Sequence, residues 1–378
     1  PLTRLSINDR GYLSNLTPGN YPEDEEGEEG GETEEKVAAA DDEKLNWDDP
    51  WPELVALEDK PTITVVTEDK EEKKFIYESD HYRFTCNVRL NRSVVSSFST
   101  LFEATRVYCR ALPLAVSGGI KNNGKYDIFL FETKQQYIEA GAPPSSAGVF
   151  MRRGNKSYIM VPLTSLGVRK VGSGYMRDRD KSNGTLVHEI THQLTPGPYF
   201  ARGARGWFSE GLAEYLTSTP YRSGRFKVKS NFDDIVAYAT AYGKKDTRGR
   251  ALGEEFTAPA LVDYMTMPYS SFTGGDANFN YGLGLVLTTY FLHLDGEGDG
   301  ARMKEFLKEL RTPRKKSDEA AAEGPLESEP SKGLQSIGAH GRRALEKLLD
   351  GRTFEELQDD ITTGWRRKRV KITFRKPR

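Results

Sequence analysis

Short runs in the first half of the chain alternate between hydrophobic and polar residues. Tyr82, Phe84 and Cys86 are separated by polar neighbours, and this period of two is typical of a strand with one buried face. Shorter apolar runs of the same kind predict further strands at 63–66, 74–77, 126–131, 148–151 and 157–161. This half of the chain is therefore expected to build a sheet.

Apolar residues recur at three- and four-residue spacing elsewhere in the chain, which is the period of a helix with one buried face. Helices are expected at 93–112, 135–140, 184–194, 207–216, 232–242, 258–265, 281–294, 301–310 and near 341–349 and 353–362. The expected fold class is α+β, with a mixed sheet followed by a mainly α-helical lobe. The expected organisation is an α+β upper lobe over 61–182, a helical region over 183–310, a loop or disordered insert over 311–335, and C-terminal helices with a basic tail over 336–378.

The acidic residues are concentrated near the N-terminus. Seventeen acids and three lysines lie between Pro22 and Lys60, so this stretch has a net charge of −14, whereas the whole chain has a net charge of −2. Such a run repels itself and has little to bury, which predicts that residues 1–60 form a disordered segment. Trp47 and Trp51, which follow the acidic run, are expected to hold this tail on the body, as a simple anchor or as a docked inhibitory segment.

Composition excludes several other classes of protein. The longest apolar stretch, from Tyr281 to Leu294, has fourteen residues, whereas about twenty are needed to span a bilayer. Cys86 and Cys109 are too few for a disulfide framework and leave open one bridge or two buried thiols. The eight cations after Trp365 are interpreted as a solvated terminus. No nucleic-acid partner and no membrane span are expected, and the oligomeric state stays open.

The strongest candidate for chemistry is the run His188-Glu189-Ile190-Thr191-His192. Positions i and i+4 of a helix share one face, so both imidazoles can hold one Zn²⁺ while the glutamate between them reaches a metal-bound water. Leu186, Ile190 and Leu194 repeat every four residues, and Thr195-Pro196-Gly197 ends the helix directly afterwards. The local pattern thus supports both the helix and the metal site.

A catalytic zinc needs a third protein ligand from another element. The run Trp207-Phe208-Ser209-Glu210-Gly211-Leu212-Ala213-Glu214-Tyr215 supplies it, with Glu210 eighteen positions after His192. Glu214 is one turn further along the same helix face and is placed to accept the second N–H of a metal-binding histidine. Spacing alone does not decide between Glu210 and Glu214 as the third ligand.

The two segments together resemble the gluzincin zinc metallopeptidases, closest to their peptidase-MA-like bacterial branch. This resemblance implies a zincin-like fold, zinc ligation by His188, His192 and Glu210, and Glu189 as the general base in attack of zinc-bound water on a peptide bond. It also implies an edge strand that pairs with extended substrate, for which Gly148, Val149, Phe150 and Met151 are the matching residues.

The resemblance further implies a tyrosine that stabilises the oxyanion. Tyr281 is similar in placement to the family's tyrosine, and Tyr269, Tyr264 and His293 are the alternatives. One departure bears on specificity, because the aminopeptidase relatives use an acidic residue to hold the substrate amine, and none occurs between Ala140 and Asp178. An endopeptidase is therefore expected in preference to an aminopeptidase.

Two other functions remain open at this point. One is a non-catalytic binding or surface protein that keeps the metallopeptidase fold, although such a protein has no use for an intact Glu189. The other is a zinc hydrolase that acts on a non-peptide amide. Secretion or a periplasmic location is expected, because the relatives that the chain resembles are largely exported and the sequence starts without methionine.

Overall fold

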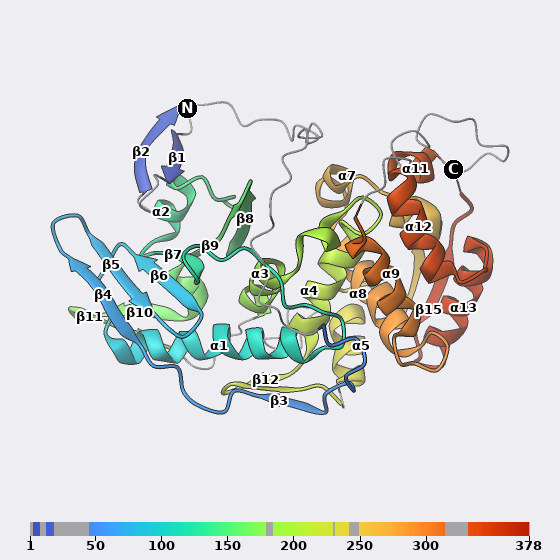
Figure 1. Cartoon of the computed structure of the whole chain (residues 1–378), viewed down its shortest axis with the longest axis horizontal. Coiled ribbons are helices and arrows are strands. Elements are labelled where there is room, and N and C mark those ends of the chain that lie inside the picture. Colours follow the sequence, from blue (N-terminus) through green and yellow to red (C-terminus); the bar gives the residue numbers. More distant parts are fainter. Residues whose placement is uncertain are drawn as a thin grey trace. The chain divides into compact units, whose positions relative to one another are not determined.

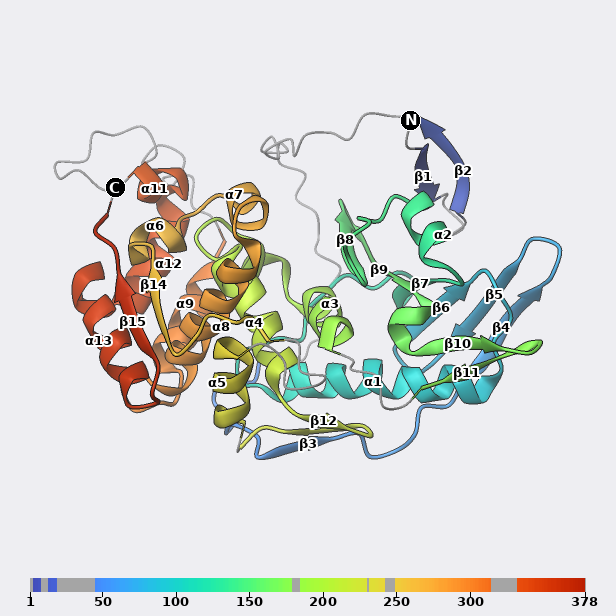
Figure 2. The same cartoon turned by 180° about the vertical axis from the view of Figure 1, so that it is seen from behind.

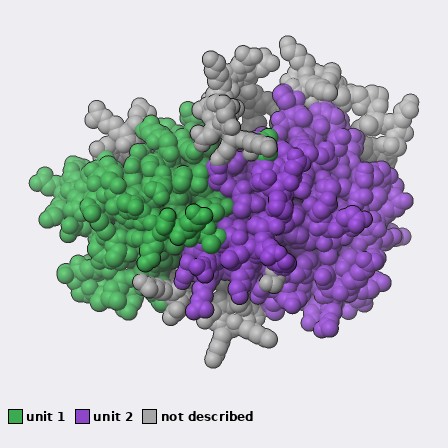
Figure 3. Space-filling model, turned by 60° about the horizontal axis from the view of Figure 1, so that its bottom comes forward, with its two compact units in different colours: residues 1–45, 56–107, 118–193 green, residues 46–55, 108–117, 194–378 purple. Residues whose placement is uncertain are grey.

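The computed structural model describes residues 3–7, 13–18, 45–178, 184–229, 231–241, 249–313 and 332–377 (Figures 1 and 2). The acidic run over 22–44 and most of the expected insert, 314–331, lie outside the described residues. The chain divides into two compact units, coloured separately in Figure 3. Unit 1 comprises residues 1–45, 56–107 and 118–193, and unit 2 comprises 46–55, 108–117 and 194–378.

Unit 1 is built on a six-stranded mixed sheet in the order β4-β5-β6-β7-β9-β8. β6 pairs with β7 and β7 with β9 in parallel, whereas the other neighbours are antiparallel. This arrangement places β8 at one edge. The strands are β4 (Thr64–Asp69), β5 (Lys74–Glu78), β6 (Tyr82–Cys86), β7 (Tyr126–Phe131), β8 (Val149–Arg153) and β9 (Lys156–Pro162).

The long helix α1 (Arg92–Ala111) packs against this sheet through aromatic side chains. Phe84 on β6 makes edge-to-face contacts with Phe98 and Phe102 of α1, at centroid distances of 5.2 Å each. All three rings are fully buried. The buried face of β6 therefore packs against the buried face of α1. Both expected elements are confirmed.

Several shorter elements complete the description of this part of the chain. A hairpin of β10 and β11 precedes the helix α3, which has the bounds expected from sequence. These elements are β1 (Thr3–Ile7), β2 (Leu13–Pro18), α2 (Lys134–Glu139), the 3-10 helix η1 (Leu163–Leu166), β10 (Val168–Val171), β11 (Gly174–Arg177) and α3 (Gly184–Leu194).

Unit 2 is mainly helical and is centred on the contact between α4 (Trp207–Ser218) and α8 (Ala277–His293). Nearly every residue of α4 is buried, and α8 is buried throughout from Gly282 to Leu292. The helices touch at Gly211 and Gly284, and a Cβ on Gly211 would lie 2.4 Å from the carbonyl oxygen of Gly284. Glycine is therefore required at this crossing, which explains its place after Glu210 in the sequence run. The apolar stretch at 281–294 is a buried helix.

Helices and short sheets surround this pair. The structure adds small strands that were not expected. The remaining elements are β3 (Leu54–Ala56), the 3-10 helix η2 (Gly197–Phe200), β12 (Tyr221–Arg222), β13 (Arg225–Lys227), α5 (Phe232–Thr240), β14 (Glu255–Ala258), α6 (Leu261–Met265), α7 (Tyr269–Gly274), α9 (Ala301–Arg311), α11 (Lys332–Ser336), α12 (Gly338–Leu349), α13 (Phe354–Arg366) and β15 (Lys371–Phe374).

The prediction of a helix at 258–265 is wrong for its first three residues. β14 occupies residues up to Ala258, and α6 begins only at Leu261, after Pro259. β14 pairs in parallel with β15, a partner that lies more than a hundred residues later in the chain. The spacing of apolar residues within a short stretch cannot predict a pairing partner so far away in the sequence.

The tryptophan-bearing segment at 46–55 is ordered and belongs to unit 2. The Asn46 side-chain amide donates to the carbonyl oxygens of Arg110 and Leu112 at the end of α1, at 2.9 and 2.7 Å. Trp51 donates to the carbonyl oxygen of Asp299, and its ring lies 4.9 Å from that of His293. The expected attachment of this stretch to the body is confirmed, and the expectation of disorder is wrong for residues 46–55.

Two further findings concern composition. Cys86 and Cys109 are buried thiols that form no disulfide with each other, so the two-thiol alternative is the correct one. Among the described residues, no helix combines the length and the apolarity that crossing a membrane requires.

Candidate metal centre

Helix α3 places both histidines of the His-Glu-x-x-His run on one face. Leu186, Ile190 and Leu194 are buried at 2% exposure or less, and they fix the orientation of the helix. The Nε2 atoms of His188 and His192 are 3.0 Å apart. Two ligand atoms at tetrahedral angles around a zinc ion are separated by roughly 3.3 Å, given bond lengths of about 2.0–2.1 Å. The histidine pair therefore fits a tetrahedral metal ion.

Helix α4 supplies the third candidate ligand. Glu210 lies in its first turn and is buried at 3% exposure. His188, His192 and Glu210 each offer one ligand atom, and these atoms all lie within 4.8 Å of one another. Two imidazoles and a carboxylate are a donor set that zinc accepts at catalytic sites. The buried group can thus bind a metal ion.

Glu189 faces the edge strand of the sheet. The backbone N–H of Phe150 in β8 donates to Oε2 of Glu189 at 2.8 Å. Gly148, just before the strand, also lies close to this side chain. A Cβ built on Gly148 would lie 3.5 Å from Cγ of Glu189. Two of the four expected substrate-binding residues, Gly148 and Phe150, therefore lie beside the expected base.

Tyr269 is hydrogen-bonded to the candidate ligand Glu210. Its hydroxyl donates to Oε1 of Glu210 at 3.0 Å, and the Arg205 guanidinium lies 4.3 Å from the centre of its ring. Burial and the negative charge of Glu210 raise the pKa of Tyr269 well above its ordinary value. The raised pKa favours the protonated hydroxyl, which is the form that donates to Glu210.

The other oxyanion candidates have different surroundings. Tyr281 on α8 contacts the ring of Phe272 at 5.6 Å, and the Arg250 guanidinium lies 4.9 Å above it. Tyr264 donates to the carbonyl oxygen of Asn280. His293 accepts from or donates to the Tyr215 hydroxyl at 2.8 Å, and burial lowers its pKa to about 4.

Glu214, expected to support a metal-binding histidine, is completely buried and forms an ion pair with Arg250. Arg250 Nε donates to one carboxylate oxygen at 2.7 Å, and its Nη2 donates to the other. The carboxylate charge is therefore compensated within unit 2. Of the two glutamates, it is Glu210 that belongs to the group able to hold a metal ion.

Reasoning from the sequence did not place Arg250 in this region and did not link Tyr269 to Glu210. Arg250 lies 36 residues after Glu214, and Tyr269 lies 59 residues after Glu210. Tyr269 is among the alternatives for the oxyanion position. Its local sequence shows only that it follows Pro268 at the start of a helix. No local pattern links either residue to its glutamate.

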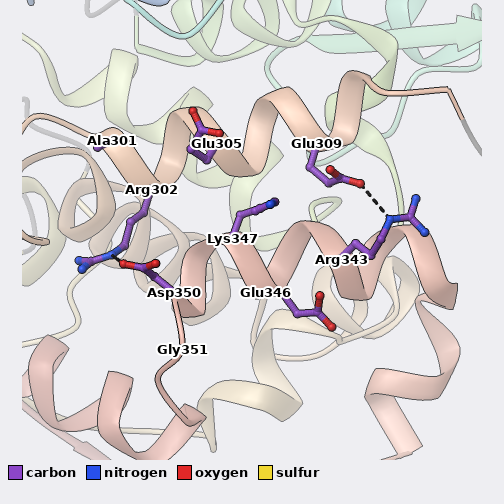
Figure 4. Close-up of a pocket in the computed structure, with 9 residues that line it drawn as sticks. All are labelled: Ala301, Arg302, Glu305, Glu309, Arg343, Glu346, Lys347, Asp350 and Gly351. Atoms are coloured by element: carbon purple, nitrogen blue, oxygen red, sulfur yellow. Dashed lines mark hydrogen bonds and ion pairs between the residues drawn. The ribbon is translucent and has the colours of Figure 1, made fainter.

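A separate pocket lies between α9 and α12 and has a volume of about 630 Å³ (Figure 4). Its charged side chains include two ion pairs, Arg343 with Glu309 and Arg302 with Asp350. None of the residues expected to carry chemistry lines it. The candidate site is therefore the group on α3 and α4.

In comparisons with known proteins, no protein-family model matches the chain, and no curated protein matches it.

Proposed function

We propose that this protein is a zinc-dependent endopeptidase of the gluzincin type. The observation that carries the proposal is the group of His188, His192 and Glu210, whose ligand atoms lie close together. Glu189 lies between the two histidines in the sequence, and its carboxylate accepts a hydrogen bond from the edge strand. The donor set favours zinc, because two imidazoles and one carboxylate leave a fourth tetrahedral position open.

The chain's own residues have distinct tasks in this reaction. A zinc ion held by the three ligands would polarise the scissile carbonyl and lower the pKa of a coordinated water toward about 7. Glu189 accepts the proton of the attacking water and delivers it to the leaving amine. Tyr269 donates to Glu210 and so holds this ligand in one orientation.

The edge strand is the proposed binding surface for the substrate backbone. Among the described strands, β8 pairs with β9 alone, and the rest of its outer edge, beside the Phe150 N–H that binds Glu189, can pair with an extended peptide. Val149, Phe150 and Met151 are partly exposed, so their side chains can also contact the peptide. The absence of an acidic residue from 140 to 177 favours an internal peptide segment over a free amino terminus.

Zinc content and cleavage of a denatured protein mixture test the proposal together. The wild-type protein should bind one zinc ion and cleave, whereas Glu189→Ala should bind zinc and fail to cleave. A wild-type protein that binds zinc without cleaving any protein or peptide would instead favour a binding protein. A wild-type protein that binds no zinc would overturn the assignment.

A further inference from the structure

We propose that Phe150 is a positioning residue for Glu189, through its backbone N–H, and for His192, through its ring. The inference rests on the proposed function and deepens it. The resemblance assigns Phe150 to the substrate, whereas the contacts of this chain assign it also to the base and to a metal ligand.

The hydrogen bond from Phe150 to Glu189 comes from the outer edge of the sheet. In an antiparallel pair, the N–H groups of successive residues point alternately toward the partner strand and away from it. Phe150 is opposite Ile159 of β9, and its N–H reaches a side chain of α3. This N–H is therefore directed at a side chain of α3, from the strand at the edge of the sheet.

A backbone donor on a paired strand is a rigid support for a carboxylate. The terminal torsion of a glutamate is broad, so an unsupported carboxylate samples many orientations. The N–H of Phe150 fixes Oε2 at 2.8 Å, and Gly148 lets the backbone come close to the same side chain. The remaining oxygen of Glu189 is then presented in one orientation, as a general base requires.

The ring of Phe150 contacts one of the proposed metal ligands, His192. It stacks on the imidazole of His192 with a centroid distance of 6.2 Å and an interplanar angle of 29°. One residue of β8 thus contacts both the base and a metal ligand of α3. A shift of the edge strand would move both groups together.

An amide-to-ester substitution at Phe150 tests the role of the N–H without changing the side chain. The α-hydroxy acid analogue of phenylalanine, introduced at this position, replaces the donor N–H by an oxygen atom. We expect kcat for a peptide substrate to fall by about 10- to 100-fold with KM and zinc content unchanged, because orientation of the base is lost while the ligands remain. An unchanged kcat would overturn the proposal.

The matched control is an ester at Val66 in β4, the opposite edge strand of the same sheet. Val66 is exposed and lies at a bulge between Val65 and Thr67, so the same chemical change there should leave kcat unaltered. Phe150→Leu keeps the N–H and removes the ring. It should weaken zinc binding and lower kcat less than the ester does.

Hydrogen exchange of the Phe150 amide provides a readout that does not depend on activity. In metal-free protein this amide should exchange slowly in the wild type and at least about 10-fold faster in Glu189→Ala, because the side chain that accepts its hydrogen bond is lost. Equal exchange rates would contradict the hydrogen bond. Wild-type protein that shows slow exchange but no cleavage would retain the contact and refute the peptidase assignment, so the two failures are distinguishable.

Discussion

Glu210 and Glu214 lie one turn apart on α4, yet their carboxylates have different partners. Glu210 receives a hydrogen bond from Tyr269 and belongs to the group that could hold a metal ion, whereas Glu214 is paired with Arg250. Two buried charges on one helix face are tolerated because each has a partner of its own. The difference allows the roles of the two glutamates to be separated by substitution.

The first prediction concerns the ion pair. Glu214→Ala should lower the free energy of unfolding by about 3–5 kcal/mol, because it leaves the Arg250 charge without its buried partner. Urea denaturation measures this change. The double variant Glu214→Ala/Arg250→Met should recover part of the loss, and a single variant as stable as the wild type would show that the pair contributes little.

The second prediction concerns Tyr269. Tyr269→Phe removes the donor to Glu210 and should weaken zinc affinity by about 10- to 100-fold, as is usual when the partner of a metal ligand is lost. Competition with a chelator gives the affinity. Tyr281→Phe is the matched variant, and it should leave zinc affinity intact while lowering kcat if Tyr281 is the oxyanion donor. Equal affinities for wild type and Tyr269→Phe would exclude the supporting role.

The third prediction concerns pH and His293. Burial lowers the pKa of His293 from 6.5 to about 4 in the folded protein. The unfolded chain therefore binds this proton first, so stability should fall as the pH drops from 6.5 to about 4 and then show no further loss from this group. NMR titration of His293 gives the pKa directly, and a midpoint near 6.5 in the folded protein would disprove the prediction.

At the scale of elements, the crossing of α4 and α8 depends on the absence of side chains. Almost all of α4 and the stretch of α8 from Gly282 to Leu292 are buried, and the backbones of the two helices meet at Gly211 and Gly284. A methyl group at such a contact meets backbone atoms, which cannot move aside as a flexible side chain can. The position of Glu210 therefore depends on a glycine that takes no part in the chemistry.

Gly211→Ala tests this dependence. Its Cβ would lie 2.3 Å from Oγ1 of Thr288 and 2.4 Å from the Gly284 oxygen, so the helices must separate. We expect a loss of about 1–3 kcal/mol or more in the free energy of unfolding, together with weaker zinc binding. Gly274→Ala is the matched control, because a Cβ there meets no atom within 4 Å. Similar stability for both variants would refute the close contact.

At the scale of the whole molecule, the metal should add to the stability of the folded chain. The ligands come from α3 and α4, which are separate in sequence, so the unfolded chain does not offer the complete group. Free zinc at about 100 times its Kd should therefore raise the free energy of unfolding by about 2.7 kcal/mol. Thermal and urea denaturation with and without zinc measure the gain, and His188→Ala should abolish it. A gain that survives in His188→Ala would place the stabilising ion elsewhere.

The sequence by itself determined the elements whose signals are local. β7 and α3 have the bounds that periodicity predicted, because apolar spacing and a proline stop act within a few residues. The same local rule placed two histidines on one helix face. Candidate ligands were therefore visible in the sequence, as was the glutamate between them.

Only the tertiary structure decided which distant groups meet. The pairing of β14 with β15, the bond from Tyr269 to Glu210 and the ion pair of Arg250 with Glu214 join residues 116, 59 and 36 positions apart. Periodicity carries no information over such separations, because packing of whole elements sets these distances. That packing brings Glu210, and not Glu214, into the group that could hold a metal ion, and it brings Phe150 into contact with Glu189.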